Sequence, residues 1–360
     1  TEKFIGQNSL LSKLQKSTGR ISALLNPVTF ILINVGIILL IHYGAVQVNT
    51  GILTQGQVVA LYNYMSQILV ELIKLANLII TVTKSFASAA RIRDVLELDT
   101  NTVYSDDKKI YNTHAVEFDR VSMHYNEGAK DALENISFTA EPGEIIGVIG
   151  GTGSGKTTLV SLIPRFYDAT KGQVTLLGQP ITAYSKAELN RHVAVVMQKA
   201  QLFKGTIRSN LLWGNENATD EELWHALSIA QSEDFVRQKP GKLDDPVEQG
   251  GRNLSGGQRQ RLTIARALVG HPDILILDDS ASALDYATDA ALRKALRTLP
   301  AETTLFIVSQ RTSSLRHADQ IIVLDDGHVV GIGKHDALMQ TCEVYREIHE
   351  SQFRKGSDVQ

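Results

Sequence analysis

The sequence of 360 residues contains a single cysteine, Cys342, and has a formal net charge of only −3. One cysteine excludes an internal disulfide framework and fits a reducing compartment. The absence of a basic excess gives no sign of a nucleic-acid-binding face, so no nucleic-acid partner is expected. The chain starts with Thr1 instead of Met and has no signal peptide with a basic start and a small-residue cleavage site. We therefore expect a fragment that begins in the middle of a longer protein.

Charge is missing from residues 21–70, which contain no Asp, Glu, Lys or Arg. Within this stretch, residues 24–46 form an apolar run of about the 20 residues that cross a bilayer core. A short polar loop at 47–57 separates it from a second, less pure run at 58–80. The pattern predicts two transmembrane helices, at about 21–48 and 57–90. The alternative is a buried helical hairpin of a soluble domain, although so many uncharged residues are hard to bury in a small fold.

Two charged residues, Glu71 and Lys74, interrupt the second apolar run. Their i, i+3 spacing lets them meet on one face of a helix. Charges inside a membrane-spanning helix usually face a bundle interior or an aqueous cavity. Alternatively, both side chains lie near the cytoplasmic end of the helix and extend to the membrane surface.

Basic residues flank the predicted helix pair but are absent from the loop inside it: Lys13, Lys16 and Arg20 precede the pair, and Lys84, Arg91 and Arg93 follow it. By the positive-inside rule, both ends of the pair are cytoplasmic and the loop is external. We assign residues 1–98 to the C-terminal part of a transmembrane domain and 99–114 to a polar linker. Residues 115–350 form a second domain, and 351–360 form a C-terminal tail. The expected location is the cell membrane, in a multi-pass protein whose second domain is cytoplasmic.

A phosphate-binding motif opens the second domain. An apolar run at 144–149 leads into Gly-Gly-Thr-Gly-Ser-Gly-Lys-Thr and then a helical segment, the context that a G-x-x-x-x-G-K-[ST] match requires. The glycines let the backbone wrap around phosphates, and successive N–H groups supply partial positive charge. The Lys156 amine is expected to reach the β- and γ-phosphates. The predicted nucleotide-binding residues are Gly150, Gly151, Thr152, Gly153, Ser154, Gly155, Lys156, Thr157 and Thr158.

A second apolar run, at 274–277, ends in Asp278. It predicts a buried parallel strand whose carboxylate lies at the carboxyl end of the sheet, where such folds bind ligands. Asp278 is therefore expected to hold Mg²⁺ together with the Thr157 hydroxyl.

Between these motifs lies Leu-Ser-Gly-Gly-Gln, at residues 254–258. This order of motifs resembles that of ATP-binding cassette (ABC) ATPases, and the resemblance covers residues 116–350. It implies an α-helical transmembrane segment followed by an α/β P-loop NTPase domain. That domain has a RecA-like core, an antiparallel β subdomain and an α-helical subdomain that carries the signature. ATP and Mg²⁺ are the implied cofactors, and the implied catalytic unit is a pair of cassettes.

The resemblance assigns roles to further residues. Tyr125 is at the position of an aromatic that stacks on adenine, and Gln198 is at that of the Q-loop glutamine, which contacts Mg²⁺ and the attacking water. Residues 282–285 resemble the D-loop, which crosses to the partner cassette. Signature residues are implied to bind the γ-phosphate of an ATP held by the other cassette: Ser255, Gly256, Gly257 and Gln258. A capping-box pattern, Thr219 with Glu222, predicts a helix start in the helical subdomain.

Two residues depart from the pattern of the family. Asp279 replaces the usual glutamate that polarises the attacking water, and Gln310 replaces the usual histidine at the γ-phosphate. Aspartate is one methylene shorter, and a misplacement of roughly 1 Å can cost on the order of 100-fold in rate. An amide donates hydrogen bonds but carries no charge. The alternatives are neutral drift or a catalytic site that binds ATP well and hydrolyses it slowly.

The combined pattern resembles the C-terminal part of an ABC exporter half-transporter, and in particular the degenerate-site subunit of heterodimeric bacterial multidrug exporters. The implied function is ATP-driven export of drugs or other amphipathic molecules. The implied partners are a second half-transporter with a competent cassette, the lipid bilayer and a transported small molecule. Two alternatives stand beside it: a homodimeric lipid or peptide exporter, and a soluble ABC ATPase of DNA repair or translation.

Overall fold

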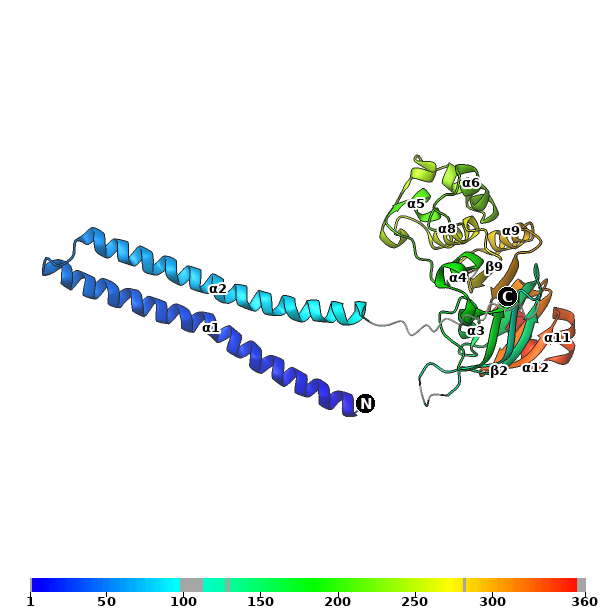
Figure 1. The fold of residues 1–360 in the computed structure, drawn as a ribbon, viewed down its shortest axis with the longest axis horizontal. Helices are drawn as coiled ribbons and strands as arrows, with labels where there is room; N and C mark the ends of the chain where they lie inside the picture. The colour runs from blue at the N-terminus through cyan, green and yellow to red at the C-terminus, as the bar shows by residue number, and fades with distance from the viewer. Residues whose placement is uncertain (1, 98–112, 127, 129, 281–282, 355–360) are drawn as a thin grey trace. The chain divides into compact units, whose positions relative to one another are not determined.

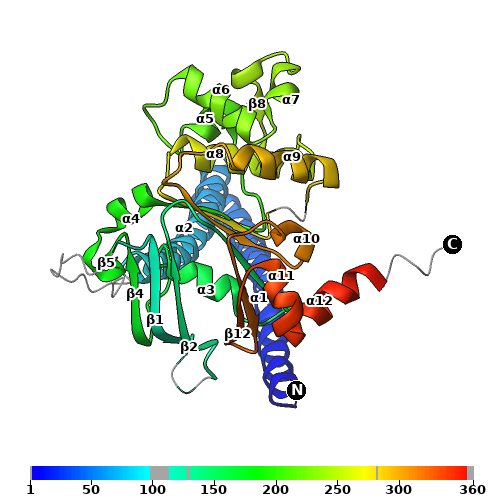
Figure 2. The ribbon, with the colours of Figure 1, turned by 90° about the vertical axis from the view of Figure 1, so that its right-hand side faces the viewer.

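The computed structural model describes residues 2–97, 113–126, 128, 130–280 and 283–354. The chain divides into two compact units, residues 1–101 and 102–360. The first unit is a helical hairpin and the second is a mixed α/β domain (Figures 1 and 2).

The hairpin consists of α1 (Glu2–Asn49) and α2 (Gln55–Leu96). Both helices are longer than the predicted ranges of 21–48 and 57–90. The apolar runs mark only the parts suited to lipid, whereas the charged residues that flank them are also good helix formers. Thr54 caps α2 in a capping box with Gln57. Residues 27–49 of α1 and all of α2 are long and apolar enough to cross a membrane.

The second unit is built on a six-stranded sheet of order β12-β11-β3-β10-β9-β6. Its strands β6, β9, β10, β3 and β11 are parallel, and β12 is antiparallel to β11. Their bounds are β3 Ile145–Gly150, β6 Val193–Val196, β9 Ile274–Asp278, β10 Thr304–Val308, β11 Gln320–Asp325 and β12 His328–Gly333. In this register Val308 pairs with Val148 on one side and Asp278 on the other. Three strand ends therefore meet at one edge of the sheet.

An antiparallel sheet of order β2-β1-β4-β5 packs against one face of this core. Its strands are β1 Val116–Met123, β2 Leu133–Ala140, β4 Lys171–Leu176 and β5 Gln179–Pro180. Phe118 stacks on Phe138, which in turn meets the edge of Phe306 from the central sheet. These buried rings join the two sheets into one hydrophobic core.

A helical layer covers residues 205–269 and contains α5, α6, α7 and α8, with a two-stranded ribbon of β7 and β8. Thr219 forms the predicted capping box with Glu222 at the start of α6. The bounds are β7 Gly205–Thr206, α5 Ile207–Leu211, α6 Asp220–Ile229, α7 Glu233–Arg237, β8 Pro246–Val247 and α8 Gly256–Val269.

The other helices are α3 Lys156–Leu162, α4 Lys186–His192, α9 Tyr286–Leu296, α10 Thr312–Leu315, α11 His335–Thr341 and α12 Glu343–Arg354. Helix α12 continues past residue 351, where the sequence predicted a tail. The three parts of the domain agree with the predicted fold class: a parallel core, an antiparallel subdomain and a helical subdomain that carries the signature.

Gly143 lies in the turn before β3, where the backbone leaves no space for a Cβ. Its φ is +82°, and a Cβ there would lie 1.9 Å from the carbonyl oxygen of Ala301. Gly128 has a similar φ of +77° but open space around it. We expect Gly128→Ala to cost about 1–2 kcal/mol for the left-handed backbone. Gly143→Ala should cost about 1–3 kcal/mol more, because the Ala301 carbonyl must move.

Urea unfolding measures this difference. Both tryptophans of the chain, Trp213 and Trp224, lie in the second unit, so its fluorescence change reports on this domain. Equal destabilisation by the two substitutions would show that the turn relaxes around the new methyl group.

Candidate nucleotide-binding site

The phosphate-binding loop leaves β3 at Gly150 and ends where α3 begins at Lys156. Gly153 and Gly155 have φ values of +84° and +100°, which side chains with a Cβ rarely adopt. A Cβ on Gly150 would lie 2.2 Å from the Leu324 carbonyl oxygen. The backbone conformation at Gly153, close packing at Gly150, and both at Gly155 thus favour glycine at these positions.

The Lys156 side chain lies across this loop. Its Nζ donates hydrogen bonds to the carbonyl oxygens of Gly150, at 2.9 Å, and Gly151, at 2.6 Å. Burial lowers the pKa of the Lys156 ammonium, while the carboxylates of Asp279 and Asp278 act in the opposite direction. The cation is therefore held at the centre of the loop, where it can meet an anionic phosphate.

The predicted metal ligands Thr157 and Asp278 lie together. The Thr157 hydroxyl donates to Asp278 Oδ2 at 3.1 Å, although the two residues are 121 positions apart. Asp278 is buried, and burial raises the pKa of its carboxyl group. The hydroxyl and carboxylate oxygens suit Mg²⁺, which commonly uses one or two carboxylates together with substrate phosphates. Among the described residues there is no cluster of three acidic, His or Cys side chains that would form an all-protein metal cage.

Asp279 and Gln198, both predicted to be catalytic, are in direct contact. Gln198 Nε2 donates to Asp279 Oδ2 at 2.9 Å. Asp279 has a φ of +44°, and its N–H donates to the Val308 carbonyl oxygen at 3.0 Å. Burial raises the pKa of the Asp279 carboxyl group, against the lowering effects of the Gln198 amide and the Lys156 and Arg311 cations. The left-handed backbone, which aspartate tolerates better than most residues, was not predictable from the motif.

Gln310, the third predicted catalytic residue, follows the end of β10 and is exposed. The preceding Ser309 N–H donates to the Val148 carbonyl oxygen at 3.1 Å, which extends the pairing of β10 with β3. The Gln310 carbonyl oxygen accepts a hydrogen bond from Gln352 Nε2 at 2.7 Å. Sequence reasoning missed Gln352, because no motif marks α12.

Tyr125 lies beside the start of α3, as its predicted role in adenine binding requires. Its hydroxyl is 2.8 Å from Thr158 Oγ1, and its ring meets the edge of Tyr167 at a centroid distance of 5.1 Å. Half of the Tyr125 side chain is exposed, so one part of the ring can receive a ligand. Stacking on adenine stays a prediction.

The signature residues form the start of α8. Ser255 Oγ accepts from the Gln258 N–H at 3.2 Å, and Gln258 Oε1 accepts from the Ser255 N–H at 3.0 Å. This is a capping box, and it leaves Gly256 exposed at the helix start. Figures 1 and 2 both place α8 in a different layer from α3, so this chain does not bring its own signature and phosphate-binding loop together. Of the predicted D-loop, residue 282 lies outside the described residues, and Asp285 caps α9.

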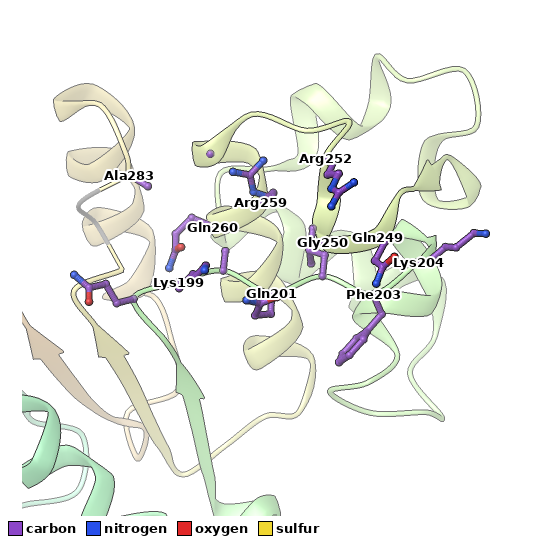
Figure 3. Close-up of a pocket in the computed structure, with 14 residues that line it drawn as sticks. Lys199, Gln201, Phe203, Lys204, Gln249, Gly250, Arg252, Arg259, Gln260 and Ala283 are labelled. Atoms are coloured by element: carbon purple, nitrogen blue, oxygen red, sulfur yellow. The ribbon is translucent and has the colours of Figure 1, made fainter. Parts of the chain in front are cut away.

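A groove of about 990 Å³ separates the signature helix from the loop that begins at Gln198 (Figure 3). Gln260 lines it, and its Nε2 donates to the Met197 carbonyl oxygen at 3.2 Å. Arg259 Nη1 donates to the Leu254 carbonyl oxygen at 2.6 Å. The signature helix and the loop of Gln198 are therefore mechanically linked.

Comparisons with known proteins agree with this geometry. The family model described as "ABC transporter" matches residues 133–282. The chain is 38% identical over 358 residues to an uncharacterized ABC transporter ATP-binding protein, YfiB, of Bacillus subtilis (strain 168), covering 99% of this chain and 62% of that protein. It is also 38% identical over 325 residues to an ATP-dependent lipid A-core flippase of Xanthomonas oryzae pv. oryzae (strain MAFF 311018), covering 89% of this chain and 55% of the flippase.

Among solved structures, a bacterial Atm1-family ABC exporter with ATP bound superposes with a TM-score of 0.71 at 27% identity. The match covers 99% of this chain and 64% of the exporter chain, so it includes the helical hairpin. The chain spans about three fifths of the length of the curated relatives that it matches over nearly its whole length. The predicted fold is confirmed by this likeness, and the match to the ABC transporter family model lies within the second unit.

The site geometry predicts separate roles for Lys156 and Asp278 in nucleotide binding. Lys156→Ala should weaken ATP binding with or without Mg²⁺, because the lysine is predicted to contact the phosphates themselves. Asp278→Asn should keep the affinity for metal-free ATP. It should lose the increase in ATP affinity that Mg²⁺ gives, because the amide is a poorer metal ligand than the carboxylate. Displacement of a fluorescent ATP analogue, in EDTA and in Mg²⁺, measures both. If Mg²⁺ increases the ATP affinity of Asp278→Asn as much as that of the unsubstituted protein, Asp278 is not a ligand of the metal.

Proposed function

We propose that the chain is the C-terminal part of an ABC exporter half-transporter, located in the cell membrane with its ATPase domain in the cytoplasm. The nucleotide site carries this proposal: the P-loop, Asp278 and Gln198 converge, while the signature faces elsewhere. The signature of a second half-transporter would contact the ATP bound to this chain's phosphate-binding loop. The signature of this chain would contact the ATP bound to the second half-transporter. ATP drives such a cycle because it binds the closed pair of cassettes more tightly than the open one.

The transported substrate would pass along α2, which has one polar face. Polar side chains recur on it at helical spacing: Asn63, Gln67, Glu71, Lys74, Asn77, Thr81, Ser85 and Ser88. Glu71 and Lys74 form an ion pair with 2.7 Å between Nζ and Oε1. The partly covered residues Val58, Met65 and Leu69 lie on the α1-facing side. At 100° per residue the ion pair is almost opposite Leu69, so it points away from α1.

A polar face with an ion pair is costly in contact with lipid tails. At 1.5 Å per residue, Asn63 lies about 12 Å from the start of α2 at Gln55, well within a bilayer core of about 30 Å. The first side chains of the polar face therefore lie too deep in the core to reach a membrane surface. Asn63 and Gln67, about 12 and 18 Å from Gln55, thus favour a face that lines an aqueous cavity of a helix bundle. Glu71 and Lys74 lie about 24 and 28 Å from Gln55, close to the far side of such a core, so the alternative that they extend to the membrane surface stands beside it.

Thiol labelling tests this orientation, because Cys342 is the only cysteine of the chain and is buried. In membrane vesicles of the full transporter, Gln67→Cys should react with a small water-soluble maleimide. Leu69→Cys, on the side that faces α1, should react at least about tenfold more slowly. Equal, slow labelling at both positions would place the polar face against protein or lipid and remove the proposed pathway.

The loop of Gln198 connects two parts of the proposed ATP machinery. In the family that the sequence resembles, this loop contacts the membrane domain. Gln198 is also bonded to Asp279, and Gln260 ties Met197 to the signature helix. A displacement of this loop would therefore reach both the chain's own ATP and the partner's.

Within the pair of cassettes, we propose that this chain holds ATP and hydrolyses it slowly. Asp279 has a short side chain that is already bonded to Gln198, and Gln310 offers a neutral amide. The phosphate- and metal-binding groups keep the geometry for binding. The intact signature would then be this chain's main contribution to hydrolysis, made at the site of a catalytically competent partner.

A lipid-exporting homodimer is the second candidate, and the similarity to a lipid A-core flippase favours it. In a homodimer both ATP sites would carry Asp279 and Gln310, so all hydrolysis would depend on them. A soluble ABC ATPase is not supported, because the exporter likeness extends over the helical hairpin. Drugs and other amphipathic molecules are the proposed substrates of the heterodimer, and lipids those of the homodimer.

Steady-state ATPase activity of the assembled transporter separates the two candidates. For the degenerate site we expect Asp279→Asn to change turnover less than about threefold and Asp279→Glu to leave it equal or higher. For the homodimer, Asp279→Asn should reduce turnover by on the order of 100-fold, because the only base would be lost. Such a loss would contradict the degenerate-site proposal. Ser351→Ala, at an exposed position whose hydroxyl donates to the Ile348 carbonyl oxygen within α12, serves as the control.

A further inference from the structure

The C-terminal helix α12 is fixed firmly to the ATPase core. Its Tyr345 is fully buried, and the Tyr345 hydroxyl lies 2.8 Å from His335 Nδ1 on α11. Helix α12 packs on β3 and β11, the strands that flank the phosphate-binding loop. Figure 2 shows α10, α11 and α12 on the same side of the domain. The helix can therefore act as a rigid support for the segment after β10.

One side chain of α12, Gln352, holds this segment at two points. Its Nε2 donates to the Gln310 carbonyl oxygen at 2.7 Å, and its Oε1 accepts from the Thr312 N–H at 3.0 Å. The Thr312 hydroxyl also donates to Oε1 at 3.2 Å, and it lies 2.8 Å from His349 Nδ1. The primary amide thus bonds to the backbone on both sides of Arg311, as a neighbouring strand would.

Two other bonds hold the neighbouring backbone, but neither reaches the Thr312 N–H: the Arg311 N–H donates to Ser309 Oγ at 3.0 Å, and Arg293 Nη1 donates to the Ser313 carbonyl oxygen at 3.0 Å. Helix α10 has only four residues, and Arg311 at its N-cap position makes no side-chain cap. The first N–H groups of a helix need partners from outside it. Gln352 supplies this partner for Thr312, which is completely buried. Without the amide, a buried N–H group would be left without its bond, which is costly enough to displace the segment.

We propose that Gln352 is a positioning residue of the nucleotide site, which holds the backbone of Gln310 so that the Gln310 amide meets the γ-phosphate of ATP. This rests on the role proposed above for Gln310. Its consequence is specific, since ADP has no γ-phosphate. Loss of the support should weaken ATP binding and leave ADP binding unchanged.

The test measures the affinities for ATP and ADP by displacement of a fluorescent ATP analogue from the full transporter. The part of the fluorescence signal that is lost in Lys156→Ala is assigned to this chain's own site. Gln352→Ala should weaken ATP about fivefold to tenfold, the size of one hydrogen bond, with ADP unchanged. Gln352→Glu has nearly the same shape and can still accept from Thr312, but as a carboxylate it cannot donate to Gln310. It should show the same selective loss even if Gln352→Ala fails to fold. Ser351→Ala, an exposed neighbour on the same helix, should change neither affinity.

Gln310→Ala separates failure of this inference from failure of the role of Gln310. A selective loss of ATP affinity in Gln310→Ala but not in either Gln352 variant would overturn the positioning role alone. Equal losses of ATP and ADP affinity in the Gln352 variants would show a purely structural role and overturn it too. If Gln310→Ala itself leaves the ratio of ATP to ADP affinity unchanged, the proposed role of Gln310 fails, and the inference fails with it.

Discussion

The nucleotide site depends on the register of three parallel strands. Val308 of β10 pairs with Val148 of β3 and with Asp278 of β9, so the strands end at the same level. The loop after each strand then emerges at one edge: the phosphate-binding loop from β3, Asp278 and Asp279 from β9, and Gln310 from β10. A shift of one residue in the pairing of β9 with β10 would turn the carboxylate of Asp278 to the opposite face of the sheet. The hydrophobic core on both faces prevents such a shift, since every residue of β9 and β10 is buried.

The convergence of these strand ends brings the carboxylates of Asp278 and Asp279 and the ammonium of Lys156 together in a partly buried site. Burial opposes ionisation of Asp278 and Asp279 by raising their pKa values, and it opposes protonation of Lys156 by lowering its pKa. The lysine offsets this cost for both carboxylates and they offset it for the lysine, whereas the charge of Asp279 raises the pKa of Asp278 further. A Mg²⁺–ATP complex brings both a cation for the carboxylates and anions for the lysine. The electrostatic arrangement of the protein alone is thus already complementary to that ligand.

Much of this could be predicted from the sequence because its signals are local. Apolar runs located β3 and β9, and the glycine spacing located the loop between β3 and α3. Three features could not be predicted in this way. The hydropathy of residues 1–20 is too low to reveal that α1 already begins at Glu2. The left-handed φ of Asp279 results from how the chain turns after β9, and the bond from Gln352 to Gln310 joins residues 42 positions apart. Such contacts depend on tertiary packing, which no short window of sequence contains.

One residue of the signature is not explained by contacts among the described residues. The capping box of Ser255 and Gln258 explains those two residues as a helix start, with no ligand needed. It does not explain Gly256, because a Cβ there would meet no described atom within 4 Å and its φ is not in the left-handed region. The same holds for Gly151 in the phosphate-binding loop, whereas Gly150 and Gly155 are required by contacts within the chain. Glycine at an exposed position without an internal constraint fits a surface that another group must approach closely. For Gly151 that group is the nucleotide proposed for this chain's own site. For Gly256, in a different layer of the domain, an open position agrees with the phosphate that a second cassette is proposed to present.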